Sequence, residues 1–234
     1  MPFPHISALS VFEESFYAAL SNQCRAIFDS SRPRERASGY DADIVLLGSD
    51  TPYPMNIFLS RPWHDLLERV LDLKASGDIS VAMHRHPSGS RSGWVHNDLT
   101  PGWFVDRHQR NGLNNSCDSG CNYKTGETLV ESGQPRQMVR AATLIFYLNN
   151  NERWTYGEGG ETGLYGTASY PVERPDKRVP PLNNSLLLFE CTPFSFHSFL
   201  NSSRGRTSLV MWLHRSKLEV ADLWGKQAIV PWRR

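Results

Sequence analysis

Apolar residues recur every three or four positions in two stretches, residues 9–29 and 62–74, which predicts two amphipathic helices. The other apolar runs are shorter, and several alternate as half-buried strands do. They cover residues 43–47, 79–86, 138–147, 183–190 and 206–214. We expect the two helices to pack on a sheet made of these strands, so the predicted fold class is mainly β with flanking helices.

Two long segments lack such periodicity. Residues 106–137 form a polar insertion, and residues 167–182 are proline-rich, as surface loops often are. A long unpatterned segment inside a compact domain is usually functional or mobile. We predict one domain over residues 1–234, with three parts: a helical support (1–77), a β core that carries the insertion (78–216) and a C-terminal tail (217–234).

Composition narrows the functional classes. Of the 234 residues, 39% are hydrophobic and 21% are charged, as in ordinary globular proteins. The formal net charge of +1 argues against a dominant nucleic-acid or membrane surface. We see neither a bilayer-spanning apolar stretch nor a signal-peptide pattern. Four cysteines do not suggest a disulfide framework, so we expect a reduced, cytoplasmic protein.

The most informative motif is His96–Asn97–Asp98, within residues 94–99, which read as a short strand. Side chains two positions apart on a strand share a face, so His96 and Asp98 can reach one metal ion. His197 stands among aromatic residues and supplies a third candidate ligand. Two histidines and one carboxylate form the facial triad of non-haem iron(II) oxygenases, which leaves positions for a 2-oxo acid and dioxygen.

A second motif follows His197. Arg206 opens the last predicted strand, and Ser208 lies on the same strand face. A guanidinium fork with a neighbouring hydroxyl can hold a carboxylate, as the distal carboxylate of 2-oxoglutarate would require. The alternative is a surface arginine on an edge strand.

Five motifs in order, between Val81 and His214, resemble the prolyl 4-hydroxylase-like branch of the Fe(II)/2-oxoglutarate-dependent dioxygenase superfamily. They are His86–Trp94 with its glycine-containing turn, the His96–Asp98 dyad, the strand 142–149 ending in Tyr-Leu-Asn, the turn Gly159–Leu164, and His197 followed by Arg206. The resemblance implies a double-stranded β-helix, or jelly roll.

The resemblance also implies roles for individual residues. His96, Asp98 and His197 would bind Fe(II), and Arg206 would anchor 2-oxoglutarate with help from Ser208 and Tyr147. His86 stands where the family often has a tyrosine that bonds 2-oxoglutarate, and an imidazole can also donate such a bond.

The implied activity is that of an oxidoreductase that uses Fe(II), 2-oxoglutarate and O2, with ascorbate as an optional stimulant. It would oxidise, most readily hydroxylate, a C–H bond and release succinate and CO2. Because Asp98 is retained, halogenation is disfavoured. A compact chain fits a small substrate, such as an amino acid or a specialised metabolite. Two alternatives stay open: a peptidyl or protein hydroxylase, and a non-catalytic β-helix binding module. The oligomeric state is also open.

The insertion follows the dyad directly, at the position where a lid over the site would form. We therefore name Trp103, Arg107 and Arg140 as candidate substrate residues, since cations there could clamp a carboxylate or phosphate. For each of them, the alternative is a solvated loop or core position.

Two other metal sites are conceivable. A cupin-type site could use His84, His86 and His197, but it would leave Asp98 and Arg206 without roles. Zinc binding by Cys117 and Cys121 would need a second nearby pair of ligands, which the sequence lacks.

Overall fold

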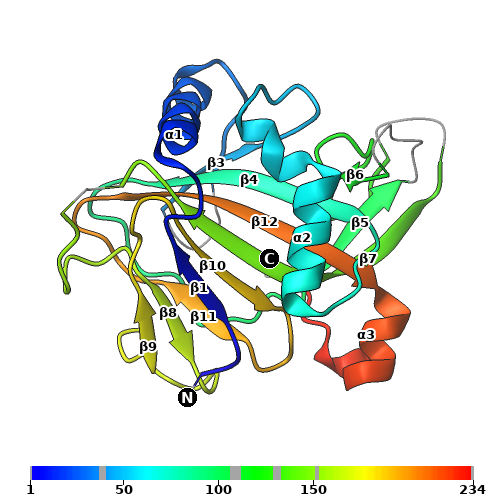
Figure 1. Ribbon diagram of the computed structural model, residues 1–234. Helices are drawn as coiled ribbons and strands as arrows, with labels where there is room; N and C mark the ends of the chain where they lie inside the picture. The colour runs from blue at the N-terminus through cyan, green and yellow to red at the C-terminus, as the bar shows by residue number, and fades with distance from the viewer. Residues whose placement is uncertain (1, 37–40, 106–111, 129–132, 151–152, 233–234) are drawn as a thin grey trace.

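The fold of the chain is built on a large sheet (Figure 1). The computed structural model describes residues 2–36, 41–105, 112–128, 133–150 and 153–232. The strand order is β1 (Ile6–Leu9), β10 (Ser185–Glu190), β7 (Pro135–Tyr147), β12 (Arg206–Ser216), β4 (Asp78–His86), β3 (Asp43–Leu46) and β2 (Glu35–Arg36). Two further strands, β5 (Pro101–Val105) and β6 (Asn114–Asn115), pair with β7 and β4. A small second sheet runs in the order β11 (Phe196–Phe199), β8 (Thr162–Tyr165) and β9 (Lys177–Val179).

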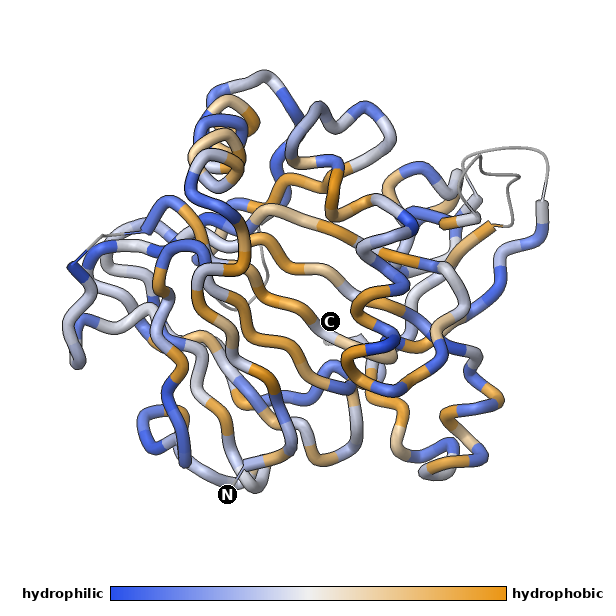
Figure 2. The backbone as a smooth tube through the Cα atoms, in the orientation of Figure 1, coloured by the Kyte–Doolittle hydropathy of each residue, from blue (hydrophilic) through white to orange (hydrophobic). Residues whose placement is uncertain are grey.

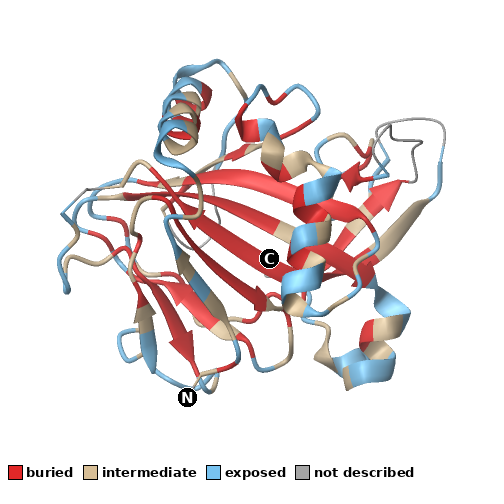
Figure 3. Cartoon of the chain, viewed as in Figure 1, coloured by how far each residue is buried: buried red, intermediate tan, exposed pale blue. Residues whose placement is uncertain are grey.

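The helices cover one face of the large sheet, which we call the outer face. They are α1 (Glu14–Asp29), the 3-10 helix η1 (Met55–Leu59) and α2 (Arg61–Leu71), and α2 crosses the strands in Figure 1. Their apolar side chains form one buried cluster with outward-facing residues of the strands, among them Leu20, Phe28, Phe58, Leu67, Met83, Phe146 and Leu209. The central strands are accordingly hydrophobic in Figure 2 and buried in Figure 3, whereas α2 keeps exposed residues.

The opposite, inner face of the large sheet meets the small sheet. Ile145, Tyr147 and Val210 form a buried cluster there with Leu164 and Val179 of the small sheet. Strand side chains alternate between faces, so each central strand supplies the helical core and the inner face in turn. The chain is therefore mainly β, with two facing sheets and helices on one side, as the sequence predicts.

Two predictions of secondary structure were wrong: one helix starts later than predicted, and one predicted strand is not formed. The predicted helix 9–29 begins only at Glu14, because residues Ile6–Leu9 pair with β10 as an edge strand. The predicted short strand 94–99 is an isolated bridge between His96 and His197. Thr100 N–H then donates to the Asp98 carbonyl at 2.6 Å, a turn that ends extended pairing.

Described parts of the insertion and of the tail pack against the sheet. The insertion contributes β6 and a bridge between Cys121 and Thr128, and its residues 106–111 and 129–132 lie outside the described residues. The tail forms α3 (Lys217–Trp224) and the 3-10 helix η2 (Lys226–Ala228), which pack on a small apolar cluster with Leu99, Val139 and Cys191. The proline-rich segment 167–182 includes β9 rather than being loop throughout. Within the described part of the chain, every helix is too short or too polar to cross a bilayer.

Candidate metal centre

The three predicted ligands lie together between the two sheets. His96 and His197 exchange backbone hydrogen bonds of 3.0 and 2.8 Å, which place their rings 4.4 Å apart between centroids. Asp98 Oδ1 is 3.8 Å from His96 Nε2, and Asp98 Oδ2 is 3.6 Å from His197 Nε2. One potential ligand atom from each residue lies within 4.8 Å of the others. We call these residues the His–Asp–His cluster.

Main-chain contacts orient both imidazoles. His96 Nδ1 lies 2.8 Å from the carbonyl of Trp94, and His197 Nδ1 lies 3.1 Å from the carbonyl of Ser195. A carbonyl only accepts, so Nδ1 carries the proton on each ring and Nε2 presents a lone pair. Both lone pairs belong to the nitrogens that lie near Asp98, which is the tautomer that metal binding needs.

The carboxylate of Asp98 is buried and held by three donors. Arg140 donates to Oδ1 at 2.9 Å, while Thr143 Oγ1 and Trp212 Nε1 each donate to Oδ2 at 2.8 Å. Burial alone would raise the pKa of Asp98, but Arg140 and the two cluster histidines lower it well below its usual range. Asp98 is therefore an anion in the folded protein.

His197 is neutral near pH 7. Burial, followed by the neighbouring His96, lowers its pKa from 6.5 to about 4. The cluster therefore combines one negative carboxylate with a neutral imidazole, which suits a divalent cation.

The predicted cosubstrate residues lie further along the inner face. Arg206 Nη1 donates to the carbonyl of Gly160 and to Thr162 Oγ1, both at 3.3 Å. The Arg206 guanidinium also lies 5.1 Å from the ring centres of Tyr147 and Phe199. Tyr147 in turn shares a 2.7 Å hydrogen bond with Thr162 Oγ1, so the turn 159–164 and β7 converge on this arginine.

Ser208 lies on β12 in the middle of the large sheet. Its register partners are His84 on β4 and Tyr147 on β7, so it lies between them in the sheet. Ser208 Oγ is fully buried and has no hydrogen-bond partner among the described residues. A buried hydroxyl without a partner costs stability, so it is a donor suited to a bound anion.

His86 takes a different position from the one expected. Its Nδ1 lies 3.0 Å from the Asp41 carbonyl, and its ring stacks on Phe199 with centroids 3.8 Å apart. Since Nδ1 must donate to that carbonyl, Nε2 of the neutral ring is an acceptor. Burial and Arg206 lower the pKa of His86 to about 2, which keeps the ring neutral. The Nδ1 hydrogen of His86 is therefore taken by the Asp41 carbonyl, and the role of His86 toward 2-oxoglutarate stays a prediction.

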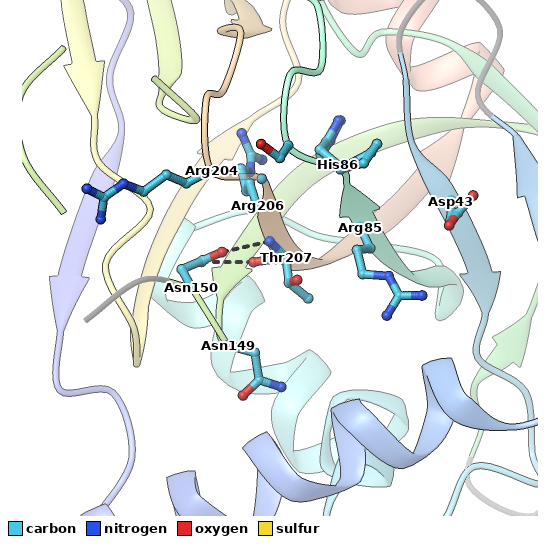
Figure 4. Close-up of a pocket in the computed structure, with 11 residues that line it drawn as sticks. Asp43, Arg85, His86, Asn149, Asn150, Arg204, Arg206 and Thr207 are labelled. Carbon is cyan, nitrogen blue, oxygen red and sulfur yellow. Dashed lines mark hydrogen bonds between the residues drawn. The ribbon is translucent and has the colours of Figure 1, made fainter. Parts of the chain in front are cut away.

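A cavity of about 350 Å³ lies at the end of β4 and β12 (Figure 4). Its walls include His86 and Arg206, together with Arg85 and Thr207, which alternate with them along the two strands. The His–Asp–His cluster does not line it. In Figure 4 Asn150 clamps the backbone of Thr207 through two hydrogen bonds, and this contact fixes the strand end that carries Arg206.

The predicted substrate residues that the structure describes, Trp103 and Arg140, differ in their surroundings. Arg140 reaches the cluster, but as the buried partner of Asp98. Trp103 lies in strand β5, and its ring packs closely against Gly126 of the insertion. Arg107 lies outside the described residues. Of the three, only Arg140 is therefore shown next to the candidate centre.

The alternative metal sites receive less support. Among the described residues, two groups of potential ligands come close enough for a metal, and the second is His64, Asp65 and Glu68 on α2. Neither group contains His84 or His86, so the cupin-type set is not assembled. Cys117 and Cys121 are free thiols, the first exposed and the second buried.

Comparison with known proteins agrees with this geometry. Residues 102–214 match the family model described as the 2OG-Fe(II) oxygenase superfamily, a range that contains His197 and Arg206 and begins after Asp98. The match supports the predicted resemblance to this superfamily of oxidoreductases, a family whose cofactors are Fe(II), 2-oxoglutarate and O2. No curated protein matches the chain.

Solved structures of similar fold include prolyl hydroxylases and an enzyme of small-molecule biosynthesis. A prolyl hydroxylase from Trichoplax adhaerens, in complex with a hypoxia inducible factor peptide fragment, has a TM-score of 0.61, 17% identity and coverage of 93% of this chain and 86% of that one. A Pseudomonas putida prolyl-4-hydroxylase has a TM-score of 0.56, 19% identity and coverage of 90% and 92%. The carbocyclase SnoK from nogalamycin biosynthesis has a TM-score of 0.51, 12% identity and coverage of 90% and 79%. At these identities the likeness shows the fold, the double-stranded β-helix, and leaves the substrate class open.

Proposed function

We propose that the chain is a 2-oxoglutarate-dependent oxygenase that hydroxylates a C–H bond of a small molecule, and that His96, Asp98 and His197 bind its Fe(II). The observation that carries this proposal is the geometry of the His–Asp–His cluster. Two histidine Nε2 atoms, each with its lone pair available, lie 3.8 and 3.6 Å from the oxygens of one buried carboxylate.

The hydrogen bonds of Asp98 support the fit to a metal. A carboxylate has about four lone-pair directions. Oδ2 already accepts two hydrogen bonds, and Oδ1 accepts one, from Arg140. One direction on Oδ1 is therefore left for a cation. The three donors also hold the carboxylate in one orientation, as partners of metal ligands commonly do.

When bound, Fe(II) would activate dioxygen, and the 2-oxo acid would be oxidised in that activation. The protein would place the reactants. Arg206 is the residue to hold the distal carboxylate through its guanidinium fork. Ser208 Oγ is the buried hydroxyl that this carboxylate would satisfy, and Tyr147 lies beside both. The apolar residues Ile145 and Val210 separate this cradle from Asp98 and its partners, and they exclude water from the inner face.

The substrate must approach from the side of His96. The side chain of His96 is 30% exposed, whereas those of Asp98 and His197 are 6% and 7% exposed. Trp94, whose ring lies 5.6 Å from that of His96, borders this opening. We assign substrate contact to the aromatic and cationic residues around it, with Arg140 as the described candidate next to the cluster. Trp103 and Arg107 stay candidate substrate residues, and Arg107 lies outside the described residues.

One anaerobic experiment tests the assignment. Fe(II) and 2-oxoglutarate are added to the protein, and their visible charge-transfer band is recorded while small molecules are screened for those that shift it. The wild type should develop the band, and His96→Ala should not. A band of equal strength in the variant would overturn the ligand assignment. Product masses measured after admission of air identify the oxidised compound, and ascorbate is expected to raise total turnover.

A peptidyl hydroxylase is the second candidate. It is favoured by the exposed edge of His96 and by the exposed aromatic ring of Phe194, which is 66% exposed and lies three positions before His197. Peptide-dependent release of succinate would establish this function, and succinate release that responds only to small molecules would exclude it. A protein that binds 2-oxoglutarate but releases no succinate with any compound would be the non-catalytic binding module.

We also propose a reducing compartment such as the cytoplasm for this enzyme. All four cysteines are free thiols, and three of them are buried. Their oxidation state in the native host, measured by thiol alkylation and mass analysis, tests this proposal. Disulfide-linked cysteines would contradict it.

A further inference from the structure

A residue of the insertion is connected to the candidate metal centre by buried hydrogen bonds. Tyr123 Oη lies 2.7 Å from His214 Nε2 and 3.2 Å from Arg140 Nε. Arg140 also donates through Nη1 to Asp98 Oδ1 at 2.9 Å. Tyr123 is therefore two hydrogen bonds away from a predicted iron ligand, although the insertion has no helical or strand pattern.

The direction of each hydrogen bond in this chain is fixed. His214 Nδ1 lies 3.0 Å from the carbonyl of Asp78, so Nδ1 carries the proton and Nε2 accepts. Burial, followed by Arg140, lowers the pKa of His214 to about 3, so its ring is neutral. The hydroxyl of Tyr123 must then donate to His214, and it accepts from Arg140. One hydroxyl thus holds two buried polar groups in a defined arrangement.

The surroundings of Tyr123 are shaped to hold its ring. A Cβ atom at Gly102 on β5 would overlap the Tyr123 ring, so the ring lies directly on the glycine backbone. Phe104 and Trp232 meet the ring edge to face, with centroids 5.6 and 5.8 Å away. Trp232, from the C-terminal tail, is itself fixed by a 2.8 Å hydrogen bond to the carbonyl of Pro101.

The same tail residue helps to enclose Arg140. The guanidinium lies 3.7 Å from the ring centre of Trp212 and 4.9 Å from that of Trp232. These rings contact the cation without competing for its hydrogen bonds. Among the described residues, Tyr123 and Asp98 are the hydrogen-bond acceptors of Arg140, so they set the directions of its hydrogen bonds while the two rings confine the guanidinium.

We infer that Tyr123 is a positioning residue for the metal centre: through Arg140 it orients the Asp98 carboxylate, so that Oδ1 keeps one lone pair directed at the metal. This inference rests on the proposed function, since it assumes that Asp98 is a metal ligand. Without the hydroxyl, Arg140 Nε loses its acceptor, and the fork can turn to place a second hydrogen on Oδ1. That second hydrogen bond would occupy the direction that the metal requires.

The test is anaerobic titration with Co(II), whose visible spectrum reports the ligand field. Tyr123→Phe should weaken Co(II) binding about 10-fold, as loss of a group that orients metal ligands typically does. At saturating Co(II), its spectrum should also differ from that of the wild type. Tyr17→Phe is the matched control, because Tyr17 accepts a 3.4 Å hydrogen bond from Asn149 N–H on the other side of the sheet. It should leave affinity and spectrum unchanged.

The outcomes separate this inference from the proposed function. An affinity within twofold of wild type, with an unchanged spectrum, overturns the role of Tyr123 while His96→Ala still abolishes binding. Equal binding by wild type and His96→Ala overturns the proposed function itself. Should Tyr123→Phe fail to fold, Trp232→Leu at the margin of the fold gives the second test. It should weaken Co(II) binding in the same direction, and unchanged binding would overturn the inference.

Discussion

The two faces of the large sheet differ in kind, although they are made by the same strands. The outer face carries Met83, Phe146 and Leu209, which are fully buried and belong to the apolar cluster under the helices. The inner face carries Ser208 and Arg206 in alternation with them, buried to a similar degree but polar. Burial of the apolar outer face stabilises the fold, whereas burial of polar groups on the inner face lowers the free energy of unfolding.

Neighbouring residues on one strand point to opposite faces of the sheet, so a residue that stabilises the fold can stand next to a residue that binds a ligand. A substitution on the outer face should change the free energy of unfolding and leave ligand binding intact. One on the inner face should change ligand binding first.

Removal of a metal ligand should have the largest effect. His96→Ala deletes one of two imidazole donors, so the affinity for Co(II) or Fe(II) should fall by more than about 100-fold. Anaerobic titration followed by absorbance measures this loss. His5→Ala, remote from the cluster, should bind as the wild type does. If both variants bound equally, the inner face would not be the metal site.

Truncation on the outer face should produce the largest loss of stability. Leu209 is fully buried among the residues of β4, β7 and the helices, so Leu209→Ala should lower the free energy of unfolding by about 2–5 kcal/mol. Urea unfolding of the metal-free protein measures it. Leu66→Ala on the exposed side of α2 is the control, expected to cost less than about 1 kcal/mol. Co(II) affinity of folded Leu209→Ala should remain near the wild-type value.

Loss of the cradle guanidinium should weaken the cosubstrate selectively. Arg206→Ala should raise the dissociation constant of 2-oxoglutarate about 10- to 100-fold, the equivalent of about 1.5–3 kcal/mol for a hydrogen bond to a charged group. Calorimetric titration of the Co(II)-loaded protein provides the constant. Arg204 lies two positions before Arg206, is exposed and pairs with Glu158. Arg204→Ala is the control and should have little effect on the dissociation constant of 2-oxoglutarate. An equal loss of 2-oxoglutarate affinity in both variants would indicate a general electrostatic attraction and would contradict a specific site at Arg206.

Lowering the pH should reduce the free energy of unfolding through the buried histidines of the inner face, because the apolar outer face carries no such groups among the described residues. Burial is the main cause that lowers the pKa of His84 to about 3, of His86 to about 2 and of His197 to about 4. Because the ordinary value is 6.5, the unfolded chain takes up these protons first as the pH falls. Stability present above pH 6.5 is therefore lost as the pH falls toward about 4, by about 1 kcal/mol per histidine per pH unit.

Urea unfolding of the metal-free protein at pH 7 and pH 5 measures this slope. His84→Asn should make it shallower, since one buried group no longer takes up a proton on unfolding. A slope unchanged in that variant would show that His84 does not contribute.

The sequence predicted the strand faces well because alternation is a local property. Arg206, Ser208 and Trp212 share a face in the sequence and in the structure. His96 and Asp98 also come together, but not through strand alternation, because residues 94–99 form no strand. The resemblance to a known family joined His197 to them. The metal-ligand roles of these residues stay a prediction until metal binding is measured.

Other contacts could not be read from local pattern. The ion pair of Arg140 with Asp98 could not be predicted from spacing, because the two residues are 42 positions apart and are brought together by the register of β5 and β7. Tyr123 lies in a segment without periodicity, and its contact with His214 depends on the bare backbone of Gly102. One signal was available: Thr143 alternates with Ile145 and Tyr147, so a polar residue on the inner face could have been noted.

His96 and His197 share a feature whose consequence is genetic. Each ring is held by the carbonyl two positions earlier in its own chain segment, at Trp94 and Ser195. Main-chain oxygens are present whatever side chain is encoded, so codons 94 and 195 can drift without altering which imidazole nitrogen is left bare. Selection on proton placement at this centre therefore falls on backbone shape, and the imidazole tautomers of His96 and His197, measured by NMR, should be unchanged in variants at these two codons that still fold.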